Sequence, residues 1–315
     1  MLKYILKKFG YMIVTLWIII TATFFLMNLI PGDPMQSGTK ILPEAVAKNL
    51  EAKWGLDKPI GERYLHYLKN ITHGELGESY TTPGLTANEV IGSRLPASIR
   101  LGLQAVGVGL VLGLLIGIIA AFHRNSWIDF IAIFIAIFGV SIPSFVFAAL
   151  LQKSLGGTFF PIVGWVTEGM GLADSLRVTA LPTLSAAIGG IATYSRFMRS
   201  SVLDVLNNDY ILTAKSKGLS NGEIIWRHVL RNSITPIISI VAPQIAGIVT
   251  GSFVIERIFS IPGLGRYYVD SVNGRDYPMI MATTIIFSAI FIFSIGIMDI
   301  LYALVDPRIR KSLIK

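Results

Sequence analysis

The sequence contains no cysteine, and only 15% of its 315 residues are charged. Without thiols the chain can form neither disulfide bonds nor a cysteine-based catalytic or redox centre. A soluble domain usually carries about a quarter charged residues. The shortage of charge comes with a hydrophobic share of 53%, and the apolar residues gather in long uninterrupted runs. These features exclude an ordinary soluble domain.

The motifs of several enzyme classes are also missing. The phosphate-binding pattern G-x-x-x-x-G-K-[ST] does not occur, so the chain has no recognisable ATP site of its own. The zinc-protease motif H-E-x-x-H is absent too, and the four histidines are scattered: His66, His73, His123 and His228. We therefore expect no cofactor, metal or nucleic acid on this chain and no enzymatic activity, including that of an intramembrane enzyme.

Long runs without Asp, Glu, Lys or Arg dominate what is present. A helix needs about 20 apolar residues to cross a bilayer, and a charge at its centre costs about 2.5–3.5 kcal/mol. The sequence therefore predicts an all-α integral membrane protein with six transmembrane helices. The six runs are Phe9–Gly32, Leu101–His123, Phe130–Gln152, Val178–Ser195, Asn232–Ile255 and Tyr277–Met298.

The distribution of basic residues predicts the orientation. Lys and Arg favour cytoplasmic loops, and with both termini inside, the whole net charge of +8 falls on inner segments. We therefore predict an N-in/C-in topology. The expected organisation is an N-terminal transmembrane helix (1–30), an extracytoplasmic loop region (31–96) with helical stretches at Pro43–Trp54 and Pro59–Asn70, a five-helix core (97–305) that contains a cytoplasmic loop (199–235), and a basic cytoplasmic tail (306–315).

Small residues and prolines mark particular places in the expected spans. A small residue every fourth position predicts that another helix approaches closely, with a substrate path as the alternative. These residues are Ala105, Gly109, Gly113, Gly117 and Ala121. Proline inside a membrane helix allows a kink, which serves either gating or static geometry. The prolines in or near spans are Pro143, Pro182 and Pro243.

A polar, basic segment, "DYILTAKSKGLSNGEIIWRHVLRNSITP" (209–236), interrupts the apolar runs. Its pattern predicts a helix over Asp209–Lys217 that ends at Gly218, since glycine tolerates the left-handed conformation. Ser220 and Glu223 have the spacing of a capping box that begins a second helix. An ordered loop with exposed apolar residues favours docking onto a partner. A helix pair lying on the bilayer surface is the alternative.

This segment resembles the cytoplasmic loop of membrane permease subunits of ATP-binding-cassette importers, in which a short coupling helix ends at a required glycine. The resemblance puts Thr213 and Ala214 at the two alanine positions of the signature and Gly218 at its glycine. Leu212 replaces an acid and Arg231 a common proline, as in the peptide and nickel subfamily. The implied ATPase-coupling residues are Asp209, Tyr210, Thr213, Ala214, Lys215, Lys217, Gly218 and Leu219.

Motifs similar to those of that subfamily, in its B-type oligopeptide permease subunits, run along nearly the whole chain. They are "LIPGDP" (29–34), "GLDKP" (55–59), "GELGES" (74–79), "LPASIRLGL" (95–103), "YSRFMRSSVLD" (194–204), "FSIPGLGR" (259–266), "RDYP" (275–278) and "DILYALVDPRIR" (299–310). The resemblance implies a multi-pass protein of the bacterial cell membrane that takes up oligopeptides. Its implied partners are a second homologous permease subunit, two cytoplasmic ATP-binding subunits that carry ATP and Mg, and an extracytoplasmic substrate-binding protein.

Alternatives stay open on cargo and mechanism. The same machinery could serve dipeptides or nickel. A self-sufficient ion-coupled carrier or channel belongs to a different class, and the scarcity of ionisable residues in mid-membrane argues against it. The polar residues that are candidates for lining a pore are Gln104, Ser141, Ser144, Thr193 and Gln244.

Overall fold

The computed structural model describes residues 2–30, 55–234, 237, 240–241 and 253–305. Their secondary structure is helical, and strand-like pairing among them is limited to isolated bridges. The all-α prediction is thus confirmed for this part of the chain. The helices are α1 (Leu2–Leu29), α3 (Ile60–Thr72), α4 (Ala87–Phe122), α5 (Trp127–Ser141), α6 (Ser144–Leu155), α7 (Leu172–Leu206), α8 (Asp209–Ser216), α9 (Asn221–Ile224), the π-helix η2 (Ile225–Leu230), α10 (Arg231–Ser233), α12 (Phe253–Ile258), α13 (Leu264–Asn273) and α14 (Tyr277–Val305).

Four of these helices are long and apolar enough to cross a membrane: α1, α4, α7 and α14. Helices α5 and α6 form a bent pair, and the described residues hold five spans if that pair counts as one. These elements correspond to five of the expected runs. The sixth run, Asn232–Ile255, lies largely outside the described residues, as do Pro243 and the stretch Pro43–Trp54. The prediction of several membrane-crossing helices is confirmed, whereas the number six and the N-in/C-in topology stay predictions. Helix α3 confirms the helical stretch expected at Pro59–Asn70.

The run Phe130–Gln152 forms two helices in place of one straight helix, so its prediction as one span stays a prediction. Helices α5 and α6 meet at an angle of 111°. The break lies at Ile142 and Pro143, where Ile142 is extended with φ −94° and ψ 125°. A residue before proline is pushed out of the helical region, so helix α5 ends there. Pro182, by contrast, lies inside the unbroken helix α7.

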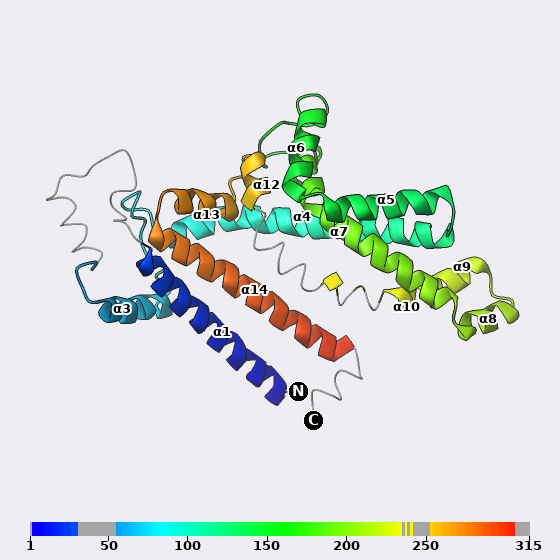
Figure 1. Cartoon of the computed structure of the whole chain (residues 1–315), viewed down its shortest axis with the longest axis horizontal. Coiled ribbons are helices and arrows are strands. Elements are labelled where there is room, and N and C mark those ends of the chain that lie inside the picture. Colours follow the sequence, from blue (N-terminus) through cyan, green and yellow to red (C-terminus); the bar gives the residue numbers. More distant parts are fainter. Residues whose placement is uncertain (1, 31–54, 235–236, 238–239, 242–252, 306–315) are drawn as a thin grey trace.

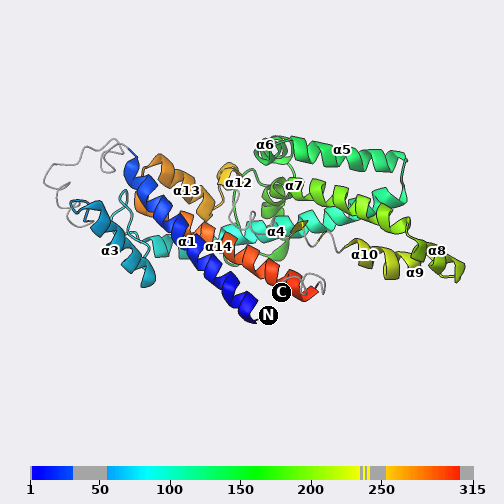
Figure 2. The same cartoon turned by 60° about the horizontal axis from the view of Figure 1, so that its bottom comes forward.

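Helices α4 and α7 lie against each other along much of their length (Figures 1 and 2). A Cβ atom added at Gly113 would come within 2.8 Å of the Tyr194 Cβ, and one at Gly117 within 2.5 Å of the Ser195 carbonyl oxygen. Larger residues therefore cannot replace these glycines without moving helix α7 away. The helix-packing interpretation of the small residues is confirmed.

Helix α4 begins at Ala87, well before the charge-free run that starts at Leu101. Thr86 and Glu89 form a capping box at its start, and Pro96 lies inside the helix. Residues 87–96 of the expected extracytoplasmic segment are therefore helical and continuous with the core. Helices α1 and α14 pack side by side, while α3 and α13 lie at one end of the molecule and α8 at the other (Figures 1 and 2).

Candidate functional site

The predicted loop forms an ordered structure at the end of helix α7, far from α13 (Figure 1). Helix α8 begins three residues after α7 ends, and its inner face carries the buried side chains of Ile211 and Ala214. These pack into one apolar cluster with Val205 of α7, Ile224 of α9 and Val229 of η2. Burial of an apolar side chain of this size contributes about 1.5–3 kcal/mol. Helix α8 is therefore fixed to the end of α7 and follows its movement.

Gly218 ends helix α8, as the sequence predicted. Its φ is +78°, a conformation that costs a residue with a side chain about 1–2 kcal/mol. The Gly218 N–H donates to the carbonyl of Lys215 at 2.9 Å, and the Leu219 N–H donates to that of Ala214 at 3.3 Å. This pair of bonds is the Schellman motif, which satisfies the last carbonyls of a helix. Gly218 thus sets the direction in which the chain leaves α8.

The capping box predicted for the second helix is present. The Glu223 N–H donates to Ser220 Oγ at 3.4 Å, and the Ser220 N–H donates to Glu223 Oε2 at 3.1 Å. The hydrogen bonds from the Ser220 hydroxyl and backbone hold the pKa of the Glu223 carboxyl below its usual value. Helix α9 therefore starts sharply after the Gly218 turn, and η2 and α10 continue from it.

The outer face of this loop is polar and basic, with large apolar side chains that are unusually exposed. Leu212 is 66% and Trp226 is 76% exposed. We call the exposed residues the loop surface: Asp209, Tyr210, Leu212, Thr213, Lys215, Lys217, Gly218 and Trp226. Ala214 and Leu219, which the sequence also assigned to coupling, face the apolar cluster instead. Of the eight predicted coupling residues, six thus belong to the loop surface, and the other two, Ala214 and Leu219, anchor it.

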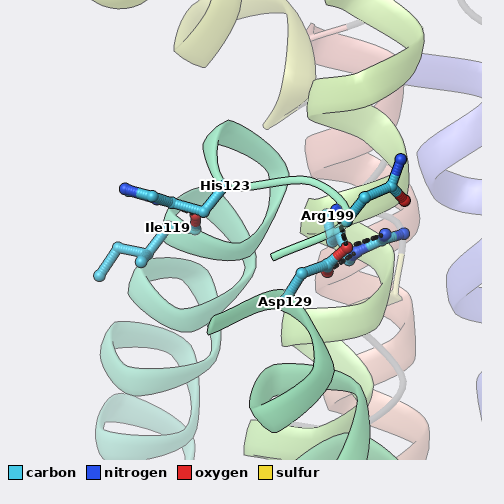
Figure 3. Close-up of polar contacts among 5 residues, drawn as sticks. Ile119, His123, Asp129 and Arg199 are labelled. Carbon is cyan, nitrogen blue, oxygen red and sulfur yellow. Dashed lines mark hydrogen bonds and ion pairs between the residues drawn. The ribbon is translucent and has the colours of Figure 1, made fainter. Parts of the chain in front are cut away.

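Sequence reasoning missed an ion pair beside this element. The Arg199 guanidinium of α7 donates from Nε to Asp129 Oδ1 at 2.6 Å and from Nη2 to Oδ2 at 2.7 Å (Figure 3). The Asn125 N–H also donates to Oδ2, at 3.0 Å. This carboxylate therefore ties the turn between α4 and α5 to the helix that carries α8. Orientation counting treated both residues as inner-side charges, and nothing in their spacing signalled a pair.

Comparison with known protein families shows which family this chain belongs to. The family described as "Binding-protein-dependent transport system inner membrane component" matches residues 113–311, and the N-terminal part of such membrane components matches residues 1–97. The chain belongs to this family. It is therefore an inner membrane component of a transport system, which accounts for its membrane-crossing helices and for the family resemblance of its loop.

Individual relatives of this inner membrane component match over nearly its full length. The dipeptide transport system permease protein DppB of Bacillus subtilis is 43% identical over 314 residues, covering 98% of both chains. The oligopeptide transport system permease protein OppB of Escherichia coli K12 is 39% identical over 310 residues, covering 98% of this chain and all of the relative. A crystal structure of an amino acid ABC transporter shares the fold, with a TM-score of 0.52 at 17% identity over 70% of this chain and 94% of that one.

Two pairs of distant motifs meet at the opposite end of this membrane component. Asp276 of "RDYP" accepts hydrogen bonds from the Tyr80 N–H and the Thr81 hydroxyl, each at 3.0 Å, and from the Ser79 hydroxyl. Glu256, three residues before "FSIPGLGR", accepts a hydrogen bond from the Ser98 hydroxyl of "LPASIRLGL" at 2.7 Å. Both acids are buried, so Asp276 holds the loop after α3 against the turn between α13 and α14, and Glu256 holds helix α12 against helix α4.

The predicted pore residues of the membrane component are not gathered at one site in the described structure. Gln104 of α4 accepts a hydrogen bond from Thr183 of α7 at 3.3 Å, which is a helix-to-helix contact. Thr193 is half-buried in α7, while Ser141 and Ser144 flank the break between α5 and α6. Gln244 lies outside the described residues. A role in lining the path stays a prediction for all five.

Proposed function

We propose that this chain is a permease subunit of an ATP-driven importer for peptides. The observation that carries this proposal is identity of about two fifths over 98% of the chain to permease proteins named for dipeptide and oligopeptide transport. Identity of that extent covers the core and both ends of the chain together. Oligopeptides are the cargo predicted from the sequence, and the names of the relatives support dipeptides equally.

The proposed complex holds this chain, a second homologous permease, two cytoplasmic ATP-binding subunits and an extracytoplasmic substrate-binding protein. ATP and Mg would bind to the ATP-binding subunits. The family name supports dependence on a binding protein. The chain has no phosphate-binding motif of its own, so the proposal assigns ATP hydrolysis to the partner subunits.

The loop surface is the proposed contact for that ATPase. Exposed Leu212 and Trp226 supply apolar contacts, and the exposed Lys215 and Lys217 supply charge. Large exposed apolar side chains rimmed by polar ones are typical of interaction sites. Helix α8 is anchored on α7 by its buried face, so a movement of the ATPase reaches the membrane helices without being absorbed by a flexible linker.

The proposed mechanism is alternating access. When the ATPases close on ATP, they move α8 of this chain and the corresponding helix of the second permease. The membrane helices then change from the arrangement open on one side of the membrane to the arrangement open on the other. The Asp129–Arg199 pair extends the moving unit from α7 to the turn between α4 and α5. Cargo delivered by the binding protein enters on one side and leaves on the other.

Reconstitution of the complete complex tests this function. Proteoliposomes are prepared with ATP inside and the substrate-binding protein outside, and labelled peptides of two to about five residues are added outside. In a second preparation the sides of ATP and of the binding protein are exchanged. We expect accumulation that needs ATP on the ATPase side and binding protein on the other, with the preferred peptide length distinguishing oligopeptide from dipeptide cargo. Accumulation by this chain alone, abolished by a proton or sodium ionophore and indifferent to ATP, would instead identify an ion-coupled carrier.

A further inference from the structure

A cavity of about 310 Å³ lies between the C-terminal end of α1, helix α3, the loop around residue 78 and the start of α14. Aromatic rings form much of its wall: Phe24, Tyr67, Tyr80 and Tyr277. Its volume is at the lower end of the range of about 300–1,000 Å³ that is usual for small-ligand sites. None of the loop surface, the predicted pore residues or the Asp129–Arg199 pair contributes to this cavity.

Positively charged donors meet at this cavity. Lys58 and Arg63 both line it. Arg63 Nη2 donates to Asn28 Oδ1 at 2.6 Å, which fixes the guanidinium against helix α1. A guanidinium carries five N–H donors, so four have no bond to a side chain of the described residues beyond that one. The planar fork of arginine matches the oxygen atoms of a phosphate or a carboxylate.

Two phenol groups in the wall have no hydrogen-bond partner among the described residues. They are the hydroxyls of Tyr67 and Tyr277, and both oxygen atoms are buried. Tyr277 as a whole is only 9% exposed. Burial also raises the pKa of Tyr67, so that its phenol keeps the proton and can donate. A buried donor without an acceptor costs about 1–3 kcal/mol, and a bound oxyanion would remove that cost.

We propose that this cavity binds the phosphate group of an anionic phospholipid headgroup. The cavity lies at the ends of two membrane-crossing helices, the level at which headgroups meet protein. In the proposed topology this is the outer leaflet. Exposed apolar side chains on α1 and α3, among them Leu26, Leu29 and Leu65, are available to acyl chains. Free phosphate has the same oxygen chemistry, and the experiment below distinguishes the two sources.

Native mass spectrometry of the purified complex, taken from bilayers of mixed phosphatidylcholine and phosphatidylglycerol, tests the site. Lys58→Gln and Tyr277→Phe should each lower the retention of phosphatidylglycerol about fivefold, which is about 1 kcal/mol at 1.4 kcal/mol per factor of ten. The matched control is Lys69→Gln, which removes an exposed lysine of α3 that does not line the cavity. It should retain the lipid as the wild type does.

Tyr277→Phe separates ligand binding from folding. Its hydroxyl has no partner among the described residues, so its removal should leave the melting temperature of the delipidated complex unchanged or raise it. Phosphatidylglycerol should raise the melting temperature of the wild type but not of this variant. If inorganic phosphate but not phosphatidylglycerol raises the melting temperature of the wild type, and Tyr277→Phe loses this rise, free phosphate is the occupant of the same anion site. Equal responses of the wild type, Lys58→Gln, Arg63→Gln and Tyr277→Phe to both probes would overturn the proposal.

Discussion

Asp129 and Arg199 form a two-pronged ion pair, with the Asp129 side chain 3% and the Arg199 side chain 24% exposed. The pair joins two segments that are 70 residues apart in the sequence. Arg199 lies on α7, the helix that carries the loop surface, ten residues before the start of α8 at Asp209. A movement of α8 and α7 therefore carries the turn between α4 and α5 with it.

Breaking this pair should destabilise the complex and weaken the link between ATP hydrolysis and uptake. Removing one partner of a buried pair costs about 3–5 kcal/mol, and the partial exposure of Arg199 favours the lower end. We expect Asp129→Asn and Arg199→Gln each to lower the melting temperature of the purified complex and the number of peptides taken up per ATP. In the double variant the losses should be clearly less than additive, because the second change leaves no uncompensated charge. Fully additive losses would mean that the two side chains act independently.

The close contact of α4 with α7 gives a second prediction. Gly117→Val should push the helices apart, because its Cβ would meet the Ser195 carbonyl oxygen and the Met198 side chain. Overpacking of this kind costs about 1–3 kcal/mol or more. The control is Gly107→Val on the same helix, where an added Cβ meets nothing within 4 Å. Thermal unfolding should show a loss for Gly117→Val alone, and equal losses for the two variants would disprove a glycine-dependent contact.

The absence of native cysteine makes the topology directly testable. Single cysteines at Lys58, Asn273 and Ser220 replace side chains that are all exposed in this chain, so the chain itself does not shield them from the reagent. An impermeant maleimide added to intact cells should label the first two positions and leave Ser220 unlabelled until the membrane is opened. Labelling at Ser220 from outside would reverse the proposed topology and remove the loop surface from the reach of a cytoplasmic ATPase.

Energy supply gives a fourth prediction. The purified chain without its partners should neither bind nor hydrolyse ATP, since it has no phosphate-binding motif. Equilibrium binding of a fluorescent ATP analogue and release of phosphate check both statements, with the complete complex as the positive control. Specific turnover by the isolated chain would contradict the proposed division of labour.

Local patterns predicted the parts of the molecule that short-range physics determines. The glycine stop at Gly218 and the capping box of Ser220 and Glu223 depend on neighbours within a turn or two, and both are confirmed. The small-residue face at Gly113 predicted a close helix contact, which is also confirmed, but not that helix α7 makes it. Pro143 indicated that a kink was possible, but the 111° bend between α5 and α6 was not predicted, because charge counting treats a broken span and a straight one alike. Contacts between distant segments, such as Asp129 with Arg199, leave no signal in the spacing of one sequence.

The same limit applies to the candidate sites. The loop could be recognised because its residues are contiguous, whereas the cavity near Tyr277 is assembled from α1, α3 and α14. Nothing in the spacing of Phe24, Tyr67 and Tyr277 indicated that their rings line one cavity. In the proposed complex the path would be lined by residues of several helices, with a second permease supplying the other half.

In the proposed mechanism the loop surface works as a rigid contact for the ATPase, and Gly218 gives it its shape. Two glycines of this loop allow a matched comparison: an added Cβ meets nothing within 4 Å at either Gly218 or Gly222, but only Gly218 has a positive φ. Asparagine tolerates that conformation better than other residues with a side chain.

Peptide uptake and ATP hydrolysis by the reconstituted complex, measured for Gly218→Val, Gly218→Asn and Gly222→Val, test this claim most directly. We predict that all three variants insert and assemble, that Gly218→Val loses about tenfold or more of its uptake per ATP, and that the other two keep most of it. The cost of about 1–2 kcal/mol for a left-handed residue with a side chain is enough to shift the chain direction after α8. Uptake by Gly218→Val at the wild-type rate in a properly inserted complex would contradict the account.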